Sequence, residues 1–107
     1  MKTIKIKNKN IMKKIIIFGC SEHAKVVLDC IKLIKNYRAI GFIDDKDYSP
    51  SLAKKIKYLG SIKDLNKIIK NHNSKNLFGI IGVGDNIMRK KISLKVEKFN
   101  KKFKWAN

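Results

Sequence analysis

The sequence contains few arginines and few acidic residues. Only Arg38 and Arg89 among its 26 basic residues are arginine, and eight Asp and Glu leave a net charge of +18. Proteins that read bases and phosphates rely on the planar guanidinium fork, so a surplus made almost entirely of lysine argues against specific nucleic-acid binding. Lysine, isoleucine and asparagine together form about half of the chain. All three can be encoded by A- and T-rich codons, so a compositional bias explains the charge as well as a function does.

Long apolar runs are also missing. The run at residues 15–18 is the longest near the start, whereas a membrane span needs about 18 apolar residues. It is also too short for the apolar segment of a signal peptide. We therefore expect a cytoplasmic protein without a membrane span.

Cysteine and histidine are too sparse for a metal site. If Cys20 and Cys30 lie on one helix, their ten-residue separation places them about 15 Å apart, which is too far for a disulfide. Neither has a Cys or His partner at metal-ligand spacing. We expect two free, buried or half-buried thiols and no metal. His72, in a polar stretch, is expected to be a solvated surface residue.

Proline occurs once and glycine six times in 107 residues, which excludes a collagen-like or low-complexity chain. The hydrophobic fraction of 44% is that of a globular protein. A chain of this length buries roughly two-thirds of its unfolded surface, which is enough for one modest core. One domain is therefore expected.

Short β-branched runs alternate with helical stripes of apolar residues. This order predicts an α/β fold: a small Rossmann-like three-layer domain with a parallel sheet of four to five strands and helices on both faces. Residues 1–11 are interpreted as an extension before an alternative start at Met12, or as an edge strand over residues 3–7. The interval 46–57 is predicted to be a loop. The expected strands are 14–18, 39–43, 58–60, 77–83 and 103–106, and the expected helices begin near Ser21, Ser61 and Asn86.

Three turns follow the carboxyl ends of the predicted strands, where ligands bind in such sheets. Gly19 leads the first turn into a helix whose free N–H groups suit a phosphate, with Ser21 as the expected helix cap. Only this glycine of the dinucleotide pattern G-x-G-x-x-G is present, which disfavours an NAD-dependent enzyme. Asp44 and Asp45 close the second strand, where acidic residues accept hydrogen bonds from ribose hydroxyls; a solvated turn is the alternative.

The third turn joins a glycine pair to a helix start. Gly84 has no side chain to hinder the approach of a ligand, and Asn86 lies at the expected cap. Arg89, one turn into the helix, is expected to reach back to a phosphate; a capped helix with a surface arginine is the alternative. Because the three turns share one edge of the sheet, together they favour a nucleotide site.

These segments resemble the N-terminal domain of the PglD-like sugar acyltransferases, the family of bacterial sialic acid O-acetyltransferases and UDP-amino-sugar N-acetyltransferases. The resemblance covers residues 12–107 and includes three motifs in family order. They are Lys14-Ile15-Ile16-Ile17-Phe18-Gly19-Cys20-Ser21-Glu22-His23-Ala24-Lys25-Val26-Val27, then Gly41-Phe42-Ile43-Asp44-Asp45, and then Ile81-Gly82-Val83-Gly84-Asp85-Asn86 with Arg89-Lys90-Lys91-Ile92.

The resemblance implies a domain that binds a nucleotide sugar. Ser21 and His23 take the positions of the family's sugar-nucleotide turn, Asp44 and Asp45 those around the uridine, and Gly84 that of the glycine before the helix cap. Glu22 stands where family members usually have glycine. We expect its carboxylate to repel a pyrophosphate, and its side chain to be unsuited to a turn with positive φ.

The family's catalytic histidine and acetyl-CoA site belong to a left-handed β-helix that follows this domain. No residue here matches that histidine, so we expect no catalytic residue and no cofactor in this chain, with acetyl-CoA bound only by the β-helix domain. The resemblance thus suggests the UDP-sugar-binding domain of an acetyl-CoA-dependent sugar acetyltransferase of bacterial surface-glycan biosynthesis, truncated, inactive alone and monomeric. The alternative is a stand-alone basic module that binds polyanions, either nucleic acid or a membrane surface.

Overall fold

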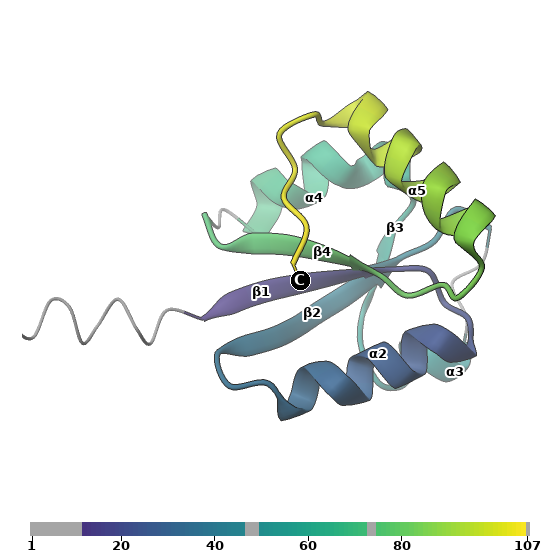
Figure 1. Cartoon of the computed structure of the whole chain (residues 1–107). Coiled ribbons are helices and arrows are strands. Elements are labelled where there is room, and N and C mark those ends of the chain that lie inside the picture. The colour runs from purple at the N-terminus through teal and green to yellow at the C-terminus, as the bar shows by residue number, and fades with distance from the viewer. Residues whose placement is uncertain (1–11, 47–49, 73–74, 107) are drawn as a thin grey trace, which may run out of the picture.

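The computed structural model describes residues 12–46, 50–72 and 75–106. The extension or edge strand expected within residues 1–11 lies outside the described residues. Strands and helices alternate along the chain, as the pattern of apolar residues predicted (Figure 1). In chain order they are β1 (Lys13–Phe18), α2 (Glu22–Leu33), β2 (Tyr37–Ile43), α3 (Pro50–Ala53), β3 (Tyr58–Gly60), the 3-10 turn η1 (Ile62–Asp64), α4 (Leu65–His72), β4 (Leu77–Ile81) and α5 (Asn86–Phe99).

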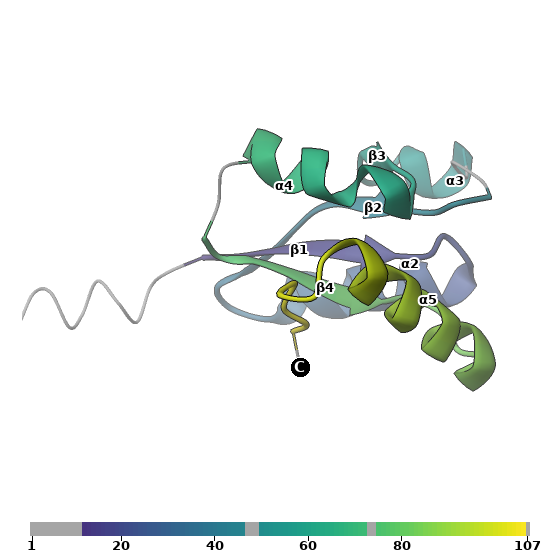
Figure 2. The ribbon, with the colours of Figure 1, turned by 90° about the horizontal axis from the view of Figure 1, so that it is seen from above.

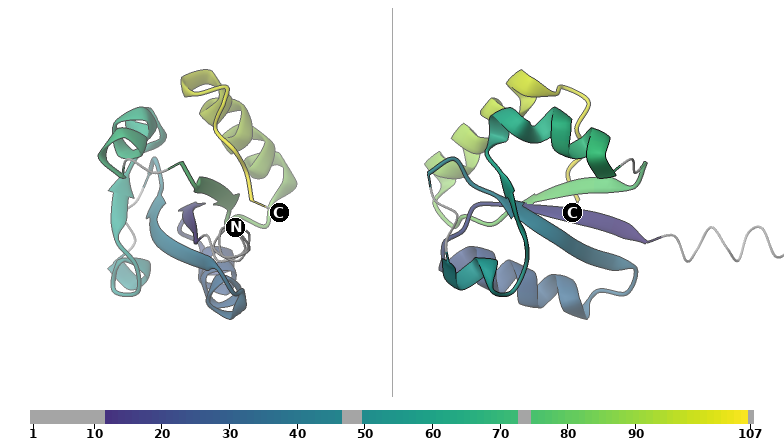
Figure 3. Two further views of the ribbon diagram at one scale, coloured as in Figure 1. Left: turned by 90° about the vertical axis from the view of Figure 1, so that its left-hand side faces the viewer. Right: turned by 180° about the vertical axis from the view of Figure 1, so that it is seen from behind.

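The four strands form one parallel sheet in the order β3-β2-β1-β4. Seen along the strands, α4 and α5 cover one face and α2 and α3 the other (Figure 3, left). From above, α4 lies over the side of the sheet that carries β2 and β3, and α5 over the side that carries β4 (Figure 2). This is the predicted three-layer α/β arrangement with a Rossmann-like parallel sheet.

The core is divided by the sheet into two layers. Alternating residues of β1 point to opposite faces, so Ile15 and Ile17 pack with α2, and Ile16 and Phe18 pack with α4 and α5. All four are fully buried or nearly so. A central parallel strand with helices on both faces must be apolar throughout, which explains the uninterrupted run that the sequence shows.

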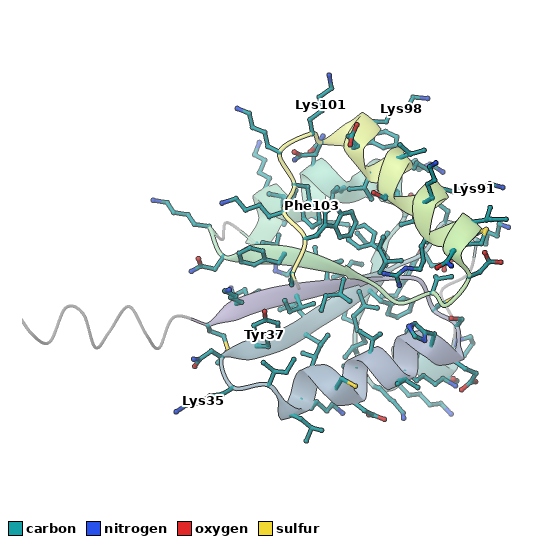
Figure 4. The ribbon with its side chains drawn as sticks, viewed as in Figure 1. Lys35, Tyr37, Lys91, Lys98, Lys101 and Phe103 are labelled. Atoms are coloured by element: carbon teal, nitrogen blue, oxygen red, sulfur yellow. The ribbon has the colours of Figure 1, made fainter. Side chains whose placement is uncertain are left out.

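The segment after α5 returns along the outer edge of β4. The strand expected at 103–106 is reduced to a single parallel bridge between Gly79 and Trp105, because only Gly79 exchanges backbone hydrogen bonds with this segment. Phe103 turns inward from the segment toward the sheet (Figure 4). Its ring and that of Trp105 meet Phe18 edge-on, at centroid distances of 5.7 and 5.2 Å. Aromatic packing therefore anchors the segment more than strand pairing does.

Three local expectations were wrong. The predicted loop contains the short helix α3, because Pro50 suits a first helical position and Leu52 is completely buried against the α2 layer. His72 is the half-buried last residue of α4 and not a solvated loop residue. The thiol of Cys20 is half-buried as expected, but Cys30 lies on the exposed side of α2.

Candidate functional site

The carboxyl ends of β1, β2 and β4 lie at one edge of the sheet, on the right of Figure 1. Each strand leads there into one of the three turns that the sequence singled out. Strand β4 departs from β1 on the side opposite to β2, so the strand order reverses between β1 and β4. Crevices at such reversal points are where open parallel sheets bind ligands.

Gly19 allows the first turn to touch the third. Its φ of 115° lies in the region that disfavours side chains, and its N–H donates to the Ile43 carbonyl at 2.8 Å. A Cβ on Gly19 would lie 2.7 Å from Val83 Cγ2 and 3.1 Å from the Gly82 carbonyl oxygen. Gly19 is thus required by the packing of the turns, in addition to any role toward a ligand.

Ser21 joins the same two turns. It stands at the N-cap position of α2, but its hydroxyl makes no capping hydrogen bond. The hydroxyl donates to the carbonyl of Gly82 at 3.2 Å instead. The expected side-chain cap was therefore wrong, because the close approach of β4 offers this hydroxyl a carbonyl acceptor.

Glu22 does not occupy the strained position that was expected. It is the first residue of α2, and among the described residues only Asn36 is a non-glycine residue with positive φ. Its exposed carboxylate accepts a hydrogen bond from Lys25 Nζ at 3.0 Å, which offsets its charge. The neighbouring His23 faces Gly84, where an added Cβ would lie 3.9 Å from His23 Nδ1.

Asp44 and Asp45 both bind neighbouring backbone, in different ways. Asp44 Oδ1 accepts from the N–H of Lys46 at 2.8 Å and so closes the turn after β2. Asp45 Oδ1 accepts from the N–H of Ile62 at 2.7 Å, and its Oδ2 is paired with the Lys95 ammonium of α5. Burial alone would raise the pKa of the Asp45 carboxyl, but the hydrogen bonds from Lys95 and Ile62 outweigh it and lower that pKa.

The third turn is held by its own side chains. Asp85 caps α5 by accepting from the N–H groups of Ile87 and Met88 at 2.8 and 3.3 Å. The guanidinium of Arg89, expected to reach a phosphate, donates to the carbonyls of Ile81 and Val83 at 3.2 and 3.0 Å. In this structure Arg89 therefore supports the end of β4.

A pocket of about 280 Å³ lies between the ends of β1 and β2 and helix α5. We call it the carboxyl-edge pocket. Its apolar walls are formed by Phe18, Ile43, Ile62, Met88 and Ile92. Its charged residues are Asp44, Asp45, Lys46, Lys91 and Lys95. An apolar interior with both signs of charge around it suits a ligand that has a flat ring as well as anionic and hydroxyl groups.

The pocket contains only part of the predicted site. Gly19, Asp44 and Asp45 line it. The remaining predicted residues lie along the adjoining first and third turns and do not line the pocket: Ser21, Glu22, His23, Gly84, Asn86 and Arg89.

Sequence patterns did not predict that residues of α5 line the pocket. Met88 and Ile92 belong to the apolar stripe of this helix, and Lys91 and Lys95 flank that stripe one helical turn apart. The apolar stripe predicted only that one side of this helix packs against the core. The lysines gave no signal, because lysine is spread over the whole chain and only the fold places these two in the pocket that Asp45 also lines.

Replacing Lys95 with methionine is expected to raise the pKa of Asp45 toward its usual value and to reduce stability at neutral pH by about 1 kcal/mol or less, since both partners are partly exposed. Because the pKa of the Asp45 carboxyl is lower in the folded than in the unfolded protein, the ionised carboxylate contributes stability at pH values above the unfolded-state pKa of about 3.9. That contribution is lost as the pH falls through the folded-state pKa. The stability difference between the two proteins should therefore shrink as the pH falls below about 3.9, and it should vanish once the Asp45 carboxyl is protonated in both folded proteins. Carboxyl carbon NMR titration and urea unfolding measure both effects.

Lys91→Met is the matched control, because it removes a lysine of the same pocket that is not bonded to Asp45. An unchanged Asp45 titration in Lys95→Met, or an equal change in both variants, would contradict the proposed coupling.

Two kinds of feature are absent from the part of the chain that the structure describes. No three or more His, Cys, Asp or Glu side chains are grouped so as to hold a metal ion. No helix there has the length and apolar character needed to cross a membrane.

Comparison with protein families gives one match. The family model described as the PglD N-terminal domain matches residues 14–96, more than half of the chain. The matched range includes all three turns and the pocket-lining part of α5. No curated protein and no solved structure matches the sequence.

Proposed function

The chain belongs to the PglD N-terminal domain family, a family related to sugar acetyltransferases, and from this premise we propose that it binds a nucleotide sugar, specifically a UDP-sugar. The observation that carries the proposal is the carboxyl-edge pocket, in which Asp44 and Asp45 border an apolar interior. In this reading the domain holds the acceptor substrate of an acetyl-CoA-dependent acetyltransfer. Acetyl-CoA binding and proton transfer are assigned to no residue of this chain.

The pocket has the size and polarity for one part of such a ligand. Its volume of about 280 Å³ is near the lower end for small-molecule sites, so it would take the base and ribose and leave the diphosphate outside. The base would lie against Met88 and Ile92, and the Asp44 carboxylate would accept a ribose hydroxyl, as acidic residues at strand ends do in nucleotide-binding folds.

The diphosphate has cationic and backbone donors within the same edge of the sheet. Lys46 and Lys91 line the pocket, and α2 begins at Glu22 with the free N–H groups and positive dipole end that favour an anion. Glu22 is held by Lys25, which limits its repulsion of a phosphate. Gly84, where an added Cβ would meet nothing nearer than His23 Nδ1 at 3.9 Å, leaves room for the sugar near His23.

Calorimetric titration with UDP, CMP and a UDP-amino-sugar tests the proposal. We expect UDP and the UDP-sugar to bind, and Asp44→Asn to weaken binding by roughly tenfold, since a hydrogen bond to a charged acceptor is worth about 1.5–3 kcal/mol. Asp29→Asn, which removes the same charge from an exposed position on α2, should leave the affinity within twofold.

A second variant tests the sugar end of the site. Gly84→Val places a side chain in the space between the third turn and His23, and should weaken UDP-sugar more than UDP. Failure of UDP and UDP-sugar to bind at millimolar concentration would refute the proposal, as would equal losses in Asp44→Asn and Asp29→Asn. The family match lends no support to the alternative of a polyanion-binding module.

A further inference from the structure

A second pocket, of about 350 Å³, lies at the opposite end of the sheet, where the strands begin. We call it the amino-edge pocket. Four separate parts of the chain contribute its basic side chains: β1, β2, the segment before β3, and the end of α4. These side chains are Lys14, Arg38, Lys55, Lys57 and His72, and no Asp or Glu lines the pocket.

Two of these cations are neighbours across the sheet. Lys14 of β1 and Arg38 of β2 are paired in register. Lys14 shares its side of β1 with Ile16, and Arg38 shares its side of β2 with Ile40, so both lie on the face covered by α4. Like charges in directly opposed positions destabilise a sheet. Lys14 is half-buried and Arg38 is exposed, so solvent screens this repulsion only in part.

These basic side chains differ in their hydrogen-bond and ion-pair partners from the other arginine and from the paired lysines of this chain. Arg89 is bonded to two carbonyls, and Lys25 and Lys95 are paired with carboxylates. Within the described residues, the side chains of Arg38 and His72 have no hydrogen-bond or ion-pair partner. The lysine-rich composition does not account for them, because the chain has only two arginines and two histidines.

We propose that the amino-edge pocket binds a small oligophosphate, an anion with two or more adjoining phosphate groups. The Arg38 guanidinium can hold two phosphate oxygens at once. Lys14, Lys55 and Lys57 supply point charges, and a neutral His72 still has one N–H to donate. A bound anion would neutralise the Lys14–Arg38 repulsion, so the pairing that is unfavourable in the free chain becomes part of the site.

This site is distinct from the proposed nucleotide-sugar site. Arg38 near the start of β2 lines one pocket and Asp44, just after β2, lines the other; the six residue steps between them correspond to about 20 Å at about 3.3 Å per residue. The two proposals can therefore fail independently, and amide signals from the two ends of β2 report on them separately.

Inorganic pyrophosphate is the probe, titrated into the full chain at constant ionic strength and followed by amide NMR. We expect saturable shifts at Arg38 and Ala39, with a Kd of about 1 mM or tighter, whether or not the diphosphate donors of the carboxyl edge also respond. Shifts confined to the carboxyl edge, or no saturation by about 10 mM, would overturn the assignment.

Charge-matched variants distinguish specific binding of pyrophosphate in the amino-edge pocket from its nonspecific attraction to a basic protein. Arg38→Gln with Lys57→Gln should weaken pyrophosphate roughly tenfold. Lys90→Gln with Lys101→Gln, exposed positions that remove the same charge and do not line the pocket, should change the affinity less than twofold.

Equal weakening by both pairs would show nonspecific charge attraction and overturn the proposal. Because Arg38→Gln removes a like-charge neighbour, the variant should fold at least as stably as the wild type. If Arg38→Gln with Lys57→Gln nevertheless unfolds, the NMR mapping on the unaltered chain still decides the question.

Discussion

Phe18→Ala is expected to lower the free energy of unfolding by about 3–5 kcal/mol. Phe18 is 1% exposed and ends the central strand. Its ring meets Phe103 and Trp105 edge-on and also walls the carboxyl-edge pocket. Removing it leaves a cavity beside two aromatic rings that a rigid sheet cannot close, and it releases the segment after α5. A small domain has about 5–15 kcal/mol of stability in total, so the loss should be a large part of it.

Urea unfolding followed by circular dichroism and by tryptophan fluorescence measures this loss. Trp105 is the only tryptophan, and its contact with Phe18 makes it a direct reporter of this part of the core. Phe99→Ala is the control, because Phe99 is 38% exposed at the end of α5, and it should cost about 1 kcal/mol or less. A loss below about 1 kcal/mol in Phe18→Ala would contradict the packing described here.

Gly19→Ala should destabilise the protein by about 2–4 kcal/mol, from two causes that add. A side chain at a φ of 115° carries backbone strain of about 1–3 kcal/mol. The new methyl group would also lie 2.7 Å from Val83 Cγ2 and 3.1 Å from the Gly82 carbonyl oxygen, so the first and third turns must separate. The same separation would break the hydrogen bond from Ser21 to Gly82. Thermal and urea unfolding measure the loss.

Gly84→Ala is the matched substitution in the neighbouring turn. Its added methyl group meets nothing nearer than 3.9 Å, so its stability should stay within about 0.5 kcal/mol of the wild type. Adding Val83→Ala to Gly19→Ala removes one of the two close contacts and should recover part of the loss, while the backbone strain remains. Similar losses in Gly19→Ala and Gly84→Ala would show that the turns are not packed as described.

Most of the fold followed from hydrophobic periodicity. The runs at the centres of β1, β2 and β4 are apolar on both sides, and the stripes of α2, α4 and α5 repeat at helical spacing. These patterns are local, so they can be read without knowing which elements meet. Helix α3 was missed because a single turn is too short to show a period, and its formation depends on the burial of Leu52 by a distant layer.

The candidate site likewise contains residues that local sequence predicted and residues whose partners depend on the fold. Gly19, Asp44 and Asp45 were predicted because glycines and carboxylates after buried strands are recognisable where they stand, and all three line the carboxyl-edge pocket. For Ser21 the sequence predicted a helix cap, and for Arg89 a contact with a phosphate; the structure shows other hydrogen-bond partners for both side chains. The Ser21 hydroxyl donates to the carbonyl of Gly82, an acceptor that becomes available only when the first and third turns come together. Arg89 donates to the carbonyls of Ile81 and Val83 next to its own helix.

The sequence by itself determined the alternation of strands and helices, the two-sided burial of the central strand, and the three turns at one edge of the sheet. Each of these depends on the period of the backbone or on the conformational preference of single residues. Only the tertiary structure decided which lysines matter: Lys95 beside Asp45, and Lys14 beside Arg38. A lysine in this chain is one of many with the same intrinsic properties, and its electrostatic role is fixed by the neighbours that folding brings within a few ångströms.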